Sequence, residues 1–134
     1  MSRQETVVLV VEDEPIILLD TIDMIERAGM TALRASNAVV ALNLLEKHQN
    51  IQILFTDINL PGSMDGLALA RKARELCPSI GLIVTSGYLL SNSISLPVGG
   101  IFIAKPYSET EVLGLFRSLL GKSALDAAKY ASLP

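Results

Sequence analysis

An unbroken apolar run, Val7 to Val11, is the feature that most limits how this chain folds. Such a run, rich in β-branched residues and without polar alternation, is typical of a strand buried on both faces, as in a parallel sheet. Three acidic residues at 12–14 and Pro15 follow it directly. Acidic residues and proline are both favoured at a helix N-terminus. A buried strand that leads straight into a helix therefore predicts an α/β chain.

The same alternation continues along the chain. We expect further strands at residues 31–35, 51–56, 81–85 and 100–104, and helices at 15–28, 38–47, 66–77 and 108–121. Ser108 and Glu111 fit an S-x-x-E capping box at the start of the last helix, and Gly121 is expected to end it. Strands that alternate with helices predict a flavodoxin-like five-stranded parallel sheet in the order 2-1-3-4-5, with helices on both faces.

Length and composition narrow the class of protein. The 134 residues are enough for one domain, and a hydrophobic content of 50% with 19% charged residues excludes a disordered chain. We assign one domain to residues 1–121 and a short C-terminal extension to 122–134, where a further short helix is an option. The longest apolar runs hold about five residues, far below the roughly 20 that cross a membrane.

Charge and cysteine content bear on location and partners. The net charge of −3 and the pI of about 5.1 give no basic footprint for nucleic acid, so we expect neither nucleic acid nor membrane as a partner. A single cysteine, Cys77, favours a reducing compartment, and the polar start of the chain shows no signal peptide. The expectation is a cytoplasmic protein.

Polar residues follow four of the predicted strands. In a sheet of this order, ligands bind at the carboxyl ends of the strands, where the strand order reverses. Oxygen ligands from carboxylates indicate a Mg²⁺ site, and a carboxylate beside Mg²⁺ can accept a phosphoryl group. A cationic side chain and a hydroxyl donor suit the charge on the transferred group. The residues at these strand ends are Glu12, Asp13, Asp57, Thr85, Ser86 and Lys105.

Two hydroxyls compete at the end of the fourth strand. Because successive side chains of a strand point to opposite faces, we expect only one of Thr85 and Ser86 to reach the site. We choose Ser86 because Gly87 follows it.

These motifs, in this order, resemble the receiver domain of two-component response regulators, the CheY-like fold. The resemblance covers about residues 5–121. It rests on Glu12-Asp13, Asp57, Pro61 with Asp65-Gly66, Ser86-Gly87 and Lys105-Pro106. It implies a stand-alone response regulator that takes a phosphoryl group from a histidine kinase or phosphotransfer protein and signals through contacts with a downstream protein. The only reactions it implies are self-phosphorylation and self-dephosphorylation.

The resemblance also assigns roles within the site. Asp57 is the phosphoacceptor, Lys105 pairs with the acyl phosphate, and Ser86 binds a phosphate oxygen. The implied Mg²⁺ ligands are Asp13, Asp57 and the backbone carbonyl of Asn59, with Glu12 acting through water. Other implied roles are a rotamer switch at Phe102 with Ser86, a cis bond before Pro106, and control of phosphoryl lifetime by Asn59 and Tyr88.

The chain departs from the family pattern at three places. The loop 61–66 is one residue longer than the commonest form, and Ser86-Gly87-Tyr88 is similar to a divergent subgroup with Thr-Gly-Tyr. Only eleven residues, 89–99, occupy the place of the fourth helix, and their serines and Pro97 disfavour a long one. We expect a short or disordered fourth helix there. Dimerisation through that face is then disfavoured, which leaves a monomer or a weak phosphorylation-dependent dimer.

Other functions stay open at this point. A small Mg²⁺-dependent phosphohydrolase with an aspartyl nucleophile usually carries a second acid two residues on, where this chain has Asn59. A flavin or nucleotide binder needs a phosphate-binding loop rich in Gly, Ser or Thr after the first strand. The acidic segment Glu12-Asp13-Glu14 stands there instead and would repel phosphate. A degenerate receiver that only binds partners is a further alternative.

Overall fold

The computed structural model describes residues 5–87 and 95–131, with side chains up to residue 120. Within this part of the chain the strands form one five-stranded parallel sheet in the order β2-β1-β3-β4-β5, as predicted. The elements are β1 (Val7–Val11), α1 (Pro15–Arg27), β2 (Thr31–Ala35), α2 (Ala38–Lys47), β3 (Ile51–Asp57), α3 (Gly66–Leu76), β4 (Gly81–Ser86), β5 (Ile101–Ala104) and α4 (Glu109–Ala131).

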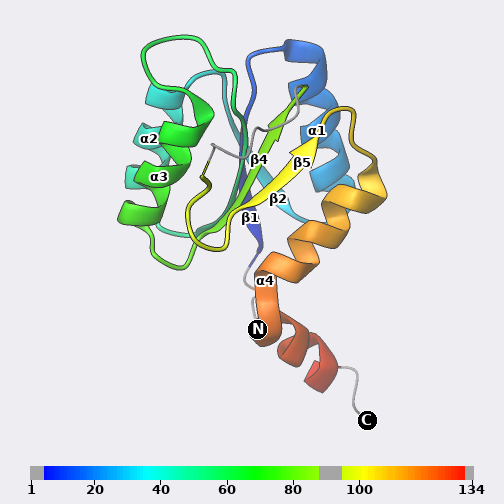
Figure 1. The fold of residues 1–134 in the computed structure, drawn as a ribbon. Helices are drawn as coiled ribbons and strands as arrows, with labels where there is room; N and C mark the ends of the chain where they lie inside the picture. Colours follow the sequence, from blue (N-terminus) through cyan, green and yellow to red (C-terminus); the bar gives the residue numbers. More distant parts are fainter. Residues whose placement is uncertain (1–4, 88–94, 132–134) are drawn as a thin grey trace.

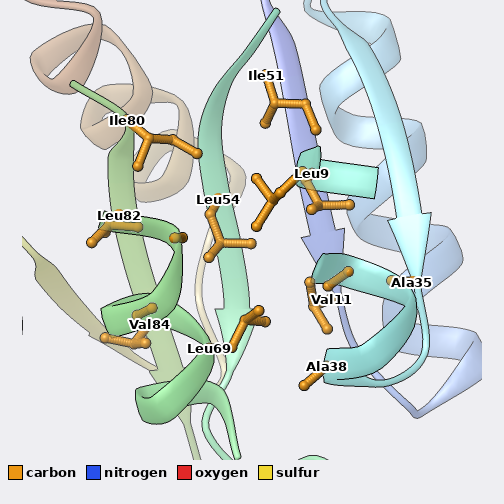
Figure 2. Close-up of a cluster of buried hydrophobic side chains, with 14 of the residues drawn as sticks. Leu9, Val11, Ala35, Ala38, Ile51, Leu54, Leu69, Ile80, Leu82 and Val84 are labelled. Atoms are coloured by element: carbon orange, nitrogen blue, oxygen red, sulfur yellow. The ribbon is translucent and has the colours of Figure 1, made fainter. Parts of the chain in front are cut away.

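Helices cover both faces of the sheet (Figure 1): α2 and α3 lie on one side, α1 and α4 on the other. All five residues of β1 are buried, as an unbroken apolar strand requires. Alternate residues of β1 enter different cores, so Leu9 packs toward α2 and α3 while Val8 packs toward α1 and α4. Figure 2 shows the first core, in which Leu69 of α3 faces Leu54 and Val84 of the sheet.

Side-chain caps fix where three helices begin. Asn37 accepts a hydrogen bond of 2.9 Å from the backbone N–H of Val40, and Asp65 starts α3 in the same way. Ser108 and Glu111 form the predicted capping box, with two reciprocal bonds of 3.1 Å. These caps fix the points at which the chain leaves the sheet edge that carries the polar residues.

The C-terminal helix is longer than predicted. Gly121 does not end α4, which runs to Ala131 and extends beyond the sheet in Figure 1. One glycine inside a helix costs only about 1 kcal/mol relative to alanine. The residues after it are mainly good helix formers, so the helix continues through Gly121 and includes most of the segment we treated as an extension.

The predicted short fourth helix falls largely on residues 88–94, which lie outside the described residues. The described remainder, 95–99, contains no helix. Arg74 of α3 holds this remainder, since its Nη2 donates to the carbonyl of Val98 at 2.8 Å. Among the helices that the structure describes, none combines the length and apolar character needed to cross a membrane.

At Gly66 the backbone at the start of α3 packs directly against the backbone at the end of β3. The Gly66 N–H donates to the carbonyl of Ile58 at 2.8 Å, which closes the long loop after β3. A Cβ placed on Gly66 would overlap the backbone carbonyl of Asp57, which is rigid chain and cannot turn aside. Gly62 lies in the same loop with a φ of 98°, a backbone conformation that glycine adopts without strain.

We predict that Gly66→Ala lowers the free energy of unfolding by about 3 kcal/mol, the upper end of the usual cost of overpacking, because the methyl group must push α3 away from β3. The matched control is Gly114→Ala in α4, where a Cβ meets nothing within 4 Å. That change should raise stability by about 0.5–1 kcal/mol through helix propensity. Urea unfolding measures the free energy of unfolding of both variants. Equal changes in the two would contradict the close contact of Gly66 with the Asp57 carbonyl.

Candidate functional site

Three carboxylates meet at the carboxyl edge of the sheet. One oxygen each from Glu12, Asp13 and Asp57 lies within 4.8 Å of the others. Asp13 is exposed, whereas Glu12 and Asp57 are only 3% and 6% exposed. The ends of β1 and β3 place them, because these strands are neighbours and run in parallel. Buried carboxylates this close need a cation, since neither water nor distance offsets their repulsion.

Lys105 supplies a cation from the end of β5. Its Nζ donates to Glu12 Oε2 at 2.8 Å and to Asp57 Oδ2 at 3.0 Å. Its backbone N–H donates to the carbonyl of Ser86 at 2.9 Å, which continues the pairing of β5 with β4. The Lys105–Pro106 peptide bond is cis, as expected. The sequence-predicted pair of Asp57 and Lys105 is therefore in direct contact.

The pKa values of two groups reflect this arrangement. Burial raises the pKa of Glu12 above its usual value, even though the bonds from Lys105 and from the Glu14 N–H act in the opposite direction. Burial lowers the pKa of Lys105, but its hydrogen bonds to Glu12 and Asp57 outweigh that effect and raise the pKa overall. Lys105 therefore stays charged, and its hydrogen bond limits how far burial raises the pKa of Glu12.

Asn59 links the acidic cluster to Ser86. Its backbone N–H donates to Asp57 Oδ1 at 3.2 Å, so both carboxylate oxygens of Asp57 have a donor. The side-chain amide of Asn59 donates to the Ser86 hydroxyl at 3.4 Å. The structure thus brings the predicted hydroxyl next to the site, where it accepts from the Asn59 amide.

The two hydroxyls at the end of β4 lie on opposite faces of the strand, as the alternation rule predicts. Thr85 lines a narrow hollow together with Glu12 and Asp57, but its hydroxyl bonds to neither of them. Strand register places Thr85 there, since it is the direct partner of Asp57 across β3 and β4. The alternation rule separates the faces correctly, yet the carboxylates face the same side as Thr85.

The remaining predicted residues lie farther from the cluster or outside the description. Phe102 is half-buried on β5, paired in register with Val84, and packs against the core under α2 and α3. Tyr88 lies outside the described residues.

Sequence reasoning missed Tyr107, which follows Lys105-Pro106 directly. Its hydroxyl lies 2.8 Å from the Thr21 hydroxyl, which in turn donates to the carbonyl of Ile17 in α1. Its ring contacts Phe55 with centroids 5.3 Å apart. Burial raises the pKa of Tyr107, so the phenol stays neutral. The polar Thr21 within the apolar side of α1 was the available signal for this contact.

The donor chemistry of the cluster fits Mg²⁺. All three clustered side chains offer carboxylate oxygen, without nitrogen or sulfur, and hard divalent cations prefer such ligands. Asp13 is exposed, which suits an ion that keeps several of its waters.

Comparison with known proteins identifies the family. The model of the response regulator receiver domain matches residues 8–116, so the chain belongs to this family. Sensor protein TorS of Escherichia coli (strain K12) is 31% identical over 109 residues, which cover 79% of this chain and 12% of TorS. The chain spans only 12% to 55% of the length of the first curated relatives that it matches.

Solved structures show the same fold. A CheY-like receiver domain protein from Methanospirillum hungatei JF-1 is 31% identical, with a TM-score of 0.78, and the match covers 85% of this chain and 92% of that one. The response regulator TrrA from Thermotoga maritima, solved in complex with Mg²⁺-BeF, is 23% identical with a TM-score of 0.77. That match covers 85% of this chain and 98% of TrrA, and at this identity it shows a common fold.

We predict that Lys105→Met lowers the free energy of unfolding by about 3–5 kcal/mol in the absence of divalent cations, because it leaves Glu12 and Asp57 buried without a cation. The control is Arg27→Met, which breaks exposed ion pairs with Asp23 and Glu109 and should leave stability nearly unchanged. Chemical denaturation compares the two. Similar losses for both variants would contradict the account.

The loss in Lys105→Met should also depend on pH. Without Lys105 the folded-state pKa of Glu12 rises further above its usual value. The folded state then binds the proton more tightly than the unfolded state, so the free energy of unfolding falls as pH rises through this interval. The difference from the unsubstituted protein should therefore be larger at about pH 8 than at about pH 5, and a pH-independent difference would contradict it.

Proposed function

We propose that this receiver domain accepts a phosphoryl group on Asp57 from a histidine kinase or phosphotransfer protein, in a Mg²⁺-dependent reaction, and signals through protein contacts. The observation that carries the proposal is the buried Asp57 carboxylate with Lys105 at 3.0 Å and two further carboxylates beside it. A structural ion pair needs one acid for one base, whereas this site gathers three acids around one lysine. A second cation balances that excess.

The chemistry follows from these positions. An Asp57 carboxylate oxygen attacks phosphorus, the bond from phosphorus to the donor's histidine nitrogen breaks, and the imidazole leaves with the electron pair. Lys105 is close enough to turn from the carboxylates to the charged phosphoryl oxygens. Bound Mg²⁺ would neutralise part of that charge, and the residues to hold it are Asp13, Asp57 and the Asn59 carbonyl, with Glu12 through water.

The output is a change at the surface around the site. The new phosphoryl group carries about −1.5 to −2 charge if it resembles phosphoserine, and it replaces the single charge of the Asp57 carboxylate. Ser86, now bonded to the Asn59 amide, is placed to turn toward a phosphoryl oxygen. Phe102 then follows Ser86 by changing rotamer, and Asn59 and Tyr88 set how readily water hydrolyses the acyl phosphate. A downstream protein reads the altered face.

Two alternatives fit the site less well. A phosphohydrolase needs a general acid near its nucleophile, and the residue two positions after Asp57 is Asn59, whose amide is used to hold Ser86. A degenerate receiver would not need to retain the contact of Lys105 with both Glu12 and Asp57. The first alternative predicts turnover of phosphate esters in excess over protein, and the second predicts no labelling at all.

The test is incubation with acetyl phosphate and Mg²⁺, followed by intact-protein mass spectrometry. We expect one phosphoryl group on the protein, none when Mg²⁺ is chelated, and none on Asp57→Asn. Asp20→Asn, which changes an exposed acid on α1, is the matched control and should label like the unsubstituted protein. Equal labelling of Asp57→Asn would contradict the assignment.

A further inference from the structure

Thr85 carries a buried hydroxyl that has no hydrogen-bond partner among the residues that the structure describes. The residue is only 2% exposed. The hollow that it lines has no room for a water-sized sphere, so solvent does not replace the missing partner. A buried hydroxyl left unpaired is costly, and such groups are uncommon in folded proteins.

The Thr85 hydroxyl lies beside the acidic residues of the site, so a role in that site is open to it. Thr85 is the strand partner of Asp57, and the same hollow is lined by Glu12 and Tyr107. Thr56, one strand over, shows the usual solution, because its buried hydroxyl donates to the Asp57 carbonyl at 2.9 Å. Thr85 is therefore an unused donor at the floor of the acidic site.

Every polar neighbour in the hollow already has another partner. Glu12 receives Lys105 on one oxygen and the Glu14 N–H on the other. Asp57 receives Lys105 and the Asn59 N–H, and Tyr107 is bonded to Thr21. Each of these carboxylate oxygens accepts one hydrogen bond and keeps a free lone pair, so a shift of Glu12 within the hollow would give Thr85 an acceptor.

Phosphorylation of Asp57 would change which donors the carboxylates have. This step rests on the function proposed above. An acyl phosphate removes the charge of the Asp57 carboxylate and draws the Lys105 ammonium toward the phosphoryl oxygens. Glu12 then keeps its charge while losing its strongest donor, in a site where an unpaired carboxylate is severely penalised. Thr85 is the donor in the hollow that is still unused.

We propose that Thr85 is a positioning residue for the phosphorylated state, whose hydroxyl donates to the Glu12 carboxylate when Lys105 turns to the phosphoryl group. The unpaired hydroxyl destabilises the resting state and its bond to Glu12 stabilises the phosphorylated one. Thr85 thus shifts the equilibrium between the two states without touching the phosphoryl group, and Ser86 acts separately from the opposite face of β4.

Thr85→Val tests this, because valine keeps the shape and removes the hydroxyl. The first measurement is the unfolding temperature of the free protein. It should stay the same or rise in Thr85→Val, since no bond is lost. Thr56→Val, which removes a paired buried hydroxyl, should lower it.

The second measurement is calorimetric titration with beryllofluoride in the presence of Mg²⁺, which imitates the phosphoryl group. Affinity should fall about tenfold or more in Thr85→Val, because a bond to a charged group is lost in the bound state. Thr85→Ser, which retains the hydroxyl, should bind within about threefold of the unsubstituted protein.

The outcomes separate the two proposals. A lower unfolding temperature in free Thr85→Val, or an unchanged affinity for beryllofluoride, overturns the role of Thr85 and leaves phosphorylation of Asp57 intact. If the unsubstituted protein binds no beryllofluoride and accepts no phosphoryl group, the proposed function fails, and the role of Thr85 fails with it.

Discussion

The ammonium of Lys105, held between Glu12 and Asp57, is the interaction on which the rest of this site depends. Parallel strands end at one edge of the sheet, so any acids at the ends of β1 and β3 are forced together. Without a cation the two buried carboxylates would protonate or expand the edge. The pairing of β5 with β4 brings the lysine to this point and makes the cluster compatible with a folded chain.

Contacts around the site restrict the positions of the three acids and of Lys105. Gly66 lets α3 touch the carbonyl of Asp57, and the N–H of Asn59 occupies the second oxygen of that carboxylate. Tyr107 ties the segment after Lys105 to Thr21 of α1. Each of these contacts restricts where the lysine and the acids can lie, so a change of charge at Asp57 must be answered by movement of Lys105. A site held in this way couples chemistry at one oxygen to the positions of several strands and helices.

Much of this arrangement can be predicted from the sequence, because strong local signals specify it. The apolar runs determine the strands, the capping residues determine where helices begin, and the sheet order brings Glu12, Asp57 and Lys105 to one edge. The predicted end of the last helix was wrong because it depended on context: Gly121 is tolerated inside α4, since its neighbours favour helix. The place of Thr85 beside Asp57 depends on strand register, which the sequence pattern does not specify. The contact between Tyr107 and Thr21 joins residues 86 positions apart, and local patterns carry little information at that range.

The proposed function depends on Asp57 being the acceptor of the phosphoryl group. Sodium borohydride reduces an acyl phosphate to an alcohol, so treatment after incubation with acetyl phosphate and Mg²⁺ marks the modified acid permanently. Peptide mass spectrometry then locates it. The account predicts homoserine at position 57 alone, dependent on Mg²⁺. Reduction at Glu12, Asp13 or another acid in place of Asp57, or the absence of any reduced residue, would contradict it.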